Sequence, residues 1–82
     1  MELSQMKEIV MPQFGETPAE EIRIVRWLKK QGDFVAEGEQ LLEVETEKAN
    51  LTIEAAYSGK IRSIDKEAGE VVKPGEIIAY IE

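Results

Sequence analysis

The chain has 82 residues, enough for one small domain, and its 43% hydrophobic and 33% charged residues are typical of a globular fold. Its formal net charge of −7 disfavours a nucleic-acid partner, because nucleic acids bind basic surfaces. The sequence contains no cysteine and no histidine, which excludes disulfides, thiolate nucleophiles, zinc–thiolate sites and the commonest general base.

Short segments rich in β-branched residues, with polar residues between them, predict strands along the whole chain. Residues 27–30 could begin a helix, but Gly32 follows too soon for a helix to extend. Strands are therefore expected near residues 7–11, 20–28, 34–36, 41–46, 50–55, 60–65, 71–73 and 77–81. This pattern predicts an all-β fold, a flattened barrel or sandwich of two four-stranded antiparallel sheets.

The second half of the chain repeats the first at an offset of 37 residues, the separation of Gly32 and Gly69. The repeat relates glycines, acidic residues and apolar residues together: 32–35 to 69–72, 38–39 to 75–76, and 41, 42 and 44 to 78, 79 and 81. Each half is therefore expected to form one supersecondary unit, and the two units to pack as a pseudo-twofold pair.

Lys48 lies between two of the expected strands, at the tip of a predicted hairpin. A lysine amine there stands clear of the domain on its flexible aliphatic stem. The tip has no glycine, which favours a type I turn or a slightly longer loop with right-handed backbone angles. The repeat relates this tip to the gap between the chain ends, so Lys48 and the termini are predicted at opposite poles.

From about residue 8 to residue 82 the chain resembles a lipoyl domain of the acyltransferase (E2) component of 2-oxo acid dehydrogenase complexes. The resemblance rests on residues 11–16, 27–33 and 38–49 together with Gly59, Gly69 and Gly75. It departs from the common family pattern at Glu47, where Asp is usual, and at 20–21, where Glu-Glu replaces Glu-Gly. The expected organisation is an N-terminal extension, residues 1–6, followed by a lipoyl-binding domain, residues 7–82.

The resemblance implies that Lys48 carries lipoate as an amide, whose dithiolane supplies the sulfur chemistry that this chain lacks. It implies four partners: a lipoate-attaching enzyme, the thiamine-diphosphate dehydrogenase E1, the acyltransferase core of E2, and the flavin enzyme E3. The domain would be a carrier without catalytic residues, needing no metal or cofactor to fold, and a monomer in isolation. No targeting or membrane segment is expected, and the implied compartment is the bacterial or archaeal cytoplasm or the mitochondrial matrix.

The residues around the lysine have a functional and a simpler interpretation. Glu45, Thr46 and Glu47 could help a ligase or dehydrogenase recognise the tip, or the two acids could simply aid solubility. Ala49 could be small so that enzymes approach the amine, or could simply fit the turn.

The first loop, residues 13–19, is also open to two interpretations. In the family the equivalent loop lies near the lipoyl-lysine, which makes Phe14, Gly15 and Glu16 candidate recognition residues. The loop could equally be only a connector between strands. Trp27 is expected in or near the core rather than in a binding platform.

Three other functions compete with the lipoyl carrier. A biotin carrier has the same fold, but its lysine is usually flanked by methionines, where this chain has Glu47 and Ala49. The glycine-cleavage carrier is a longer relative, and an unmodified docking module would never use the lysine. The parent 2-oxo acid complex stays open, because residues 27–30 lean towards the 2-oxoglutarate branch and residues 11–12 and 15–16 towards the pyruvate, branched-chain or acetoin branches.

Overall fold

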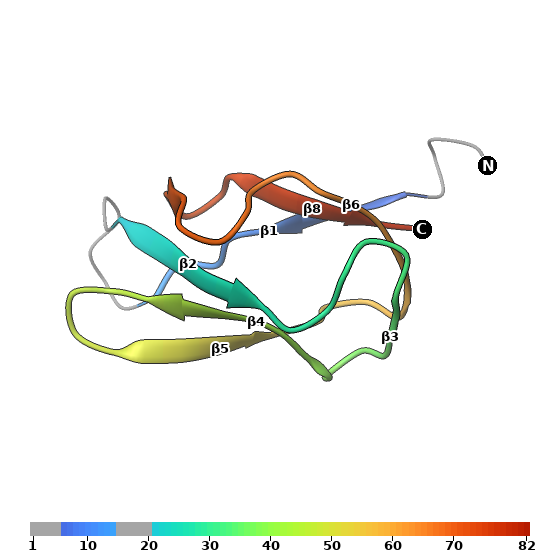
Figure 1. Cartoon of the computed structure of the whole chain (residues 1–82), viewed down its shortest axis with the longest axis horizontal. Coiled ribbons are helices and arrows are strands. Elements are labelled where there is room, and N and C mark those ends of the chain that lie inside the picture. Colours follow the sequence, from blue (N-terminus) through green and yellow to red (C-terminus); the bar gives the residue numbers. More distant parts are fainter. Residues whose placement is uncertain (1–5, 15–20) are drawn as a thin grey trace.

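The structure is a computed structural model and describes residues 6–14 and 21–82. Its strands are β1 (Lys7–Val10), β2 (Ile22–Trp27), β3 (Phe34–Val35), β4 (Gln40–Glu45), β5 (Asn50–Glu54), β6 (Gly59–Ile64), β7 (Val71–Val72) and β8 (Ile77–Ile81). They form two four-stranded sheets, in the orders β1-β8-β6-β3 and β5-β4-β2-β7, and every pair is antiparallel (Figure 1). The predicted all-β architecture is confirmed. Within the described ranges, no helix could cross a membrane.

The pseudo-twofold symmetry predicted from the repeat extends to the pairing register. β2 pairs with β4 as β6 pairs with β8, and both pairs carry an irregularity, between Ile24 and Arg26 in one half and between Ile61 and Ser63 in the other. The two sheets are also joined symmetrically, because Gly32 N–H donates to Ile61 O at 2.8 Å and Gly69 N–H donates to Ile24 O at 2.7 Å. β5 beside β4 is matched by β1 beside β8. The β4–β5 turn of one half thus corresponds, in the other half, to the place where β1 starts beside the end of β8.

One hydrophobic core fills the space between the sheets, because strands such as β2 and β6 bury alternate residues. In β4 and β8 two neighbouring residues are buried, Leu41 with Leu42 and Ile78 with Ala79. Ile61 and Ile78 are almost fully buried, and so is Ile24, which lies 37 residues before Ile61 at the repeat offset. Trp27 is half-buried against the core, and its Nε1–H donates to Lys66 O at 2.8 Å. The prediction that Trp27 serves packing is confirmed. Among the described residues, no polar or charged side chain is buried.

Four tight turns connect the short strands, and each has a glycine at its third position and an acid at its fourth. In the turn of residues 36–39, Gly38 has a φ of 87° and Glu39 N–H donates to Ala36 O at 2.9 Å. This is the pattern of a type II turn, which needs the conformational freedom of glycine at that position. The other three turns, residues 30–33, 67–70 and 73–76, have the same pattern.

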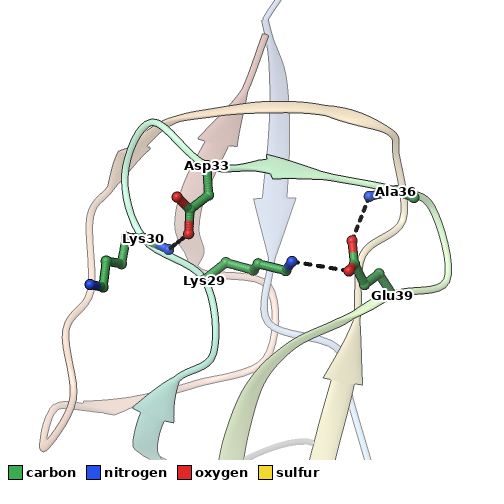
Figure 2. Close-up of polar contacts among 5 residues, drawn as sticks. All are labelled: Lys29, Lys30, Asp33, Ala36 and Glu39. Atoms are coloured by element: carbon green, nitrogen blue, oxygen red, sulfur yellow. Dashed lines mark hydrogen bonds and ion pairs between the residues drawn. The ribbon is translucent and has the colours of Figure 1, made fainter.

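The acid of each turn also caps the turn through its side chain. Asp33 accepts a hydrogen bond from Lys30 N–H at 2.8 Å, and Glu39 accepts one from Ala36 N–H at 2.9 Å (Figure 2). The carboxylates of Glu70 and Glu76 do the same in the second half. These bonds explain why glycine–acid pairs recur at the repeat offset.

Candidate functional site

Lys48 lies in the turn between β4 and β5, at one end of the long axis of the molecule. The C-terminus and the start of β1 lie towards the opposite end (Figure 1). Strand pairing runs up to Glu45 and Asn50, so the turn consists of residues 46–49. Val44, next to this last pair, is fully buried and its partner Leu51 is half-buried against the core. The hairpin is therefore held by the core almost to its tip.

The tip is closed by backbone and side-chain bonds of Thr46. Its N–H donates to Ala49 O at 2.9 Å. Its hydroxyl Oγ1 accepts from the N–H groups of Lys48 and Ala49 and donates to Ala49 O, each at 3.2 Å. No non-glycine residue of the described chain has a positive φ. The tip is therefore not a positive-φ turn of the Asn-Gly kind, in agreement with the sequence-based prediction.

The side chain of Lys48 is exposed, as are those of Glu47 and Ala49 on either side. Within the described part of the chain, no residue forms a hydrogen bond or an ion pair with the Lys48 amine. An amine in this position is open to an enzyme that forms a bond to its nitrogen.

Two acids of the hairpin face arginines on β2. Arg26 Nε donates to Glu43 Oε1 at 2.7 Å, and Arg23 Nε lies 4.0 Å from Glu45 Oε1. Such exposed pairs contribute little to stability, but they offset the charge of two carboxylates on β4. The recognition roles of Glu45, Glu47 and Ala49 stay predictions, because their exposure fits recognition and the simpler interpretations equally.

A shallow hollow of about 150 Å³ lies on the flank of the same hairpin. It is lined by residues of β2, β4 and β5: Val25, Glu43, Val44, Asn50, Leu51 and Thr52. Val25 is the extra residue at the irregularity of β2 and is 44% exposed.

The first loop is described only in part. Phe14 is half-buried and packs against the core, so much of its surface serves the fold. Gly15 and Glu16 lie outside the described residues. The recognition role of this loop stays a prediction.

The turn-closing role of Thr46 was not predicted from the sequence. A threonine or serine at the first position of a four-residue turn often bonds to the backbone two or three residues later, and this signal could have identified it. Residues 6–14 and 21–82 contain no group of three or more acids arranged to hold a metal ion.

A protein-family model described as "Biotin-requiring enzyme", which covers biotin and lipoyl attachment domains, matches residues 7–81. The solution structure of the lipoyl domain of the 2-oxoglutarate dehydrogenase complex from Azotobacter vinelandii matches with a TM-score of 0.73 and 31% identity. The match covers 92% of this chain and 94% of that domain. The chain belongs to the lipoyl domain family.

Two longer relatives contain a region similar to this lipoyl domain. The succinyltransferase component of the 2-oxoglutarate dehydrogenase complex of Bacillus subtilis is 43% identical over 93% of the chain. A mitochondrial acetyltransferase component of the pyruvate dehydrogenase complex of Arabidopsis thaliana is 46% identical over 95% of the chain. The chain spans only 18% and 14% of these proteins, respectively.

The urea carboxylase of Kluyveromyces lactis also contains a similar fold, with a TM-score of 0.76 but 22% identity, over 95% of the chain and 6% of that enzyme. This similarity concerns the fold alone. The sequence relatives therefore favour the lipoyl carrier over the biotin alternative.

Proposed function

We propose that this lipoyl domain is a swinging-arm carrier, with lipoate attached by an amide bond to the ε-nitrogen of Lys48. The observation that carries the proposal is an exposed amine at the tip of a hairpin whose strands are anchored in the core almost to the turn. The residues fit the group, because the amine is free of hydrogen bonds and ion pairs with described residues and faces solvent. When attached, the dithiolane would supply the acyl-carrying and redox chemistry.

The chain itself contributes position rather than catalysis. The core fixes the hairpin and the hairpin holds the amine outward. The start of β1 and the C-terminus lie towards the opposite end of the molecule, so a tether at either place would leave the tip clear. A tethered carrier reaches each partner at a high effective concentration, without the need for tight binding.

The proposed partners are those of a 2-oxo acid dehydrogenase complex: a lipoate-attaching enzyme, E1, the acyltransferase core of E2, and E3. Residues 7–82 would form the carrier unit, following the extension at residues 1–6. It would act in the bacterial or archaeal cytoplasm or in the mitochondrial matrix. The 2-oxo acid stays open, because the similar proteins include components of both 2-oxoglutarate and pyruvate complexes.

The attachment site can be tested by intact-mass measurement after incubation with a lipoate ligase, lipoate and ATP. The wild-type chain should gain one lipoyl increment, and Lys48→Arg should gain none. Lys60→Arg is the matched control, because Lys60 is also an exposed lysine near a strand end but lies on β6. It should be modified as the wild type is. An increment that persists in Lys48→Arg, or a wild type left unmodified while another lipoyl domain reacts, would refute the proposal.

The carrier role needs a second experiment with the modified chain. Each candidate E1 is supplied with its own 2-oxo acid, and the chain is assayed by mass for the corresponding acyl group. We expect one E1 to acylate the chain far faster than the others, which would identify the 2-oxo acid. No acylation by any E1 that acylates its own lipoyl domain would contradict the carrier role.

A further inference from the structure

The hydroxyl of Thr46 is fully used within the turn that carries Lys48. A threonine hydroxyl has one donor and two acceptor sites. Here the donor site bonds to Ala49 O, and the two acceptor sites bond to the N–H groups of Lys48 and Ala49, all at 3.2 Å. No hydrogen-bonding capacity is left for a partner enzyme.

We propose that Thr46 is a positioning residue, which orders the backbone of Lys48 and Ala49 so that enzymes meet a preformed lysine tip. This role rests on the carrier function proposed above. Thr46 would assist that function by ordering the lysine tip, not by contacting the partner enzyme. It differs from the sequence-based interpretation, in which Thr46 is itself recognised.

The core does not order these residues, so the ordering falls to the hydroxyl. Glu47, Lys48 and Ala49 are all exposed, and the nearest fully buried residue along the chain is Val44. An enzyme that binds a disordered tip must order it, and fixing even one residue costs enough free energy to change an apparent affinity about tenfold. A tip ordered in advance avoids that loss.

A hydroxyl suits this turn better than the carboxylates that cap the other four turns. At Asp33 and Glu39 a carboxylate caps the turn, and Glu39 also binds the amine of Lys29 at 3.0 Å (Figure 2). A carboxylate at position 46 could hold the Lys48 amine in the same way. A neutral hydroxyl closes the turn and leaves the amine free.

The test compares three variants of the whole chain. Thr46→Val removes the hydroxyl but keeps the shape, Thr46→Ser keeps the hydroxyl, and Thr52→Val removes an exposed hydroxyl on β5 that bonds to no described residue. Steady-state lipoylation by a ligase is followed by intact mass. Backbone amide exchange at Lys48 and Ala49 is measured by NMR on the unmodified proteins.

We expect Thr46→Val to lower kcat/KM for lipoylation about tenfold, mainly through KM, while still reaching one lipoyl group per chain. Its amide exchange at Lys48 and Ala49 should be faster than in the wild type, with an unchanged thermal midpoint. Thr46→Ser and Thr52→Val should stay within about twofold of the wild type in both measurements.

Three results would overturn the proposal. Wild-type kinetics in Thr46→Val would show that an ordered tip is not needed. Slow lipoylation of Thr46→Val with unchanged amide exchange would show that the enzyme contacts the hydroxyl directly. A loss of kcat/KM in Thr46→Ser equal to that in Thr46→Val would assign the effect to the methyl group. If Lys48 is never lipoylated, the proposed function fails, and unchanged exchange in Thr46→Val would separately refute the positioning role.

Discussion

At the residue scale, the most informative side chains outside the hairpin tip are the acids that cap the tight turns. Glu39 makes two such contacts, accepting from Ala36 N–H and from the Lys29 amine (Figure 2). In each repeated glycine–acid pair, the glycine therefore permits the turn and the acid adds a side-chain hydrogen bond that fixes it. Polar side chains that bond to a nearby backbone N–H are a general device for fixing turns.

The capping role of Glu39 predicts a pH dependence of stability. The Ala36 N–H, followed by the Lys29 amine, lowers the pKa of the Glu39 carboxyl below its ordinary value of 4.5. Because the folded state binds this proton less readily than the unfolded state, the contribution of Glu39 is fully present above about pH 4.5 and is lost as the pH falls through the lowered pKa.

The variant Glu39→Gln keeps an oxygen that can accept from Ala36 N–H but does not titrate at this position. We expect its thermal midpoint to fall less than that of the wild type between pH 7 and pH 3. A carboxyl titration of Glu39 by NMR gives an independent measure of the same pKa. An identical acid dependence in the two proteins would contradict the capping account.

At the element scale, β6 begins with a glycine for a reason that differs from that of the turn glycines. A β-carbon at Gly59 would collide with the carbonyl oxygen of Glu82 and would lie 2.6 Å from Cγ2 of Ile81. The end of β8 therefore passes directly against the start of β6, where Lys60 and Glu82 exchange backbone hydrogen bonds at 3.1 and 2.9 Å.

This close approach predicts unequal effects of two glycine-to-alanine changes. Gly59→Ala should cost about 2–5 kcal/mol, because steric overpacking adds to an unfavourable backbone conformation. Gly32→Ala should cost only about 1–2 kcal/mol, because its φ of 93° is unfavourable for alanine but its surroundings are open. Urea denaturation measures the free energy of unfolding of both variants. Equal losses of stability in the two would contradict the close approach at Gly59.

The strand positions could be predicted to within a few residues, because alternating side chains and turn residues are local signals. The register shifts within β2 and β6 could not be predicted from the sequence. Val25 and Arg62 differ in chemistry, and only the pairing with β4 and β8 reveals that each is the extra residue of its strand. A register shift depends on two strands at once, so neither strand encodes it alone.

At the scale of the whole molecule, one small core supports both the pseudo-symmetric halves and the β4–β5 hairpin that contains Lys48. Ile61 and Ile78 are 1% and 0% exposed and lie in the same cluster as Val44 at the base of the tip. Because a domain of this size has limited stability, losses in the core should be felt by the whole fold.

Substitution of either isoleucine by alanine should cost about 2–5 kcal/mol in the free energy of unfolding. Should these variants fail to fold, the milder Ile61→Val and Ile78→Val changes should cost about 0.5–1.5 kcal/mol. Phe34→Ala is the control, because Phe34 is 72% exposed, and it should change stability by less than about 0.5 kcal/mol. Chemical denaturation checks all of these values, and losses under about 1 kcal/mol at both isoleucines changed to alanine would contradict the core assignment.

The sequence by itself determined the strand order along the chain, the repeat and the choice of Lys48, because periodicity, turn residues and a lysine between two strands are properties of neighbouring residues. Only the tertiary structure decided that Phe14 packs against the core, that Gly59 is required by the passing end of β8, and that the Thr46 hydroxyl is saturated within its turn. These features depend on the distances between particular atoms once the sheets have closed around the core. Sequence spacing does not specify those distances.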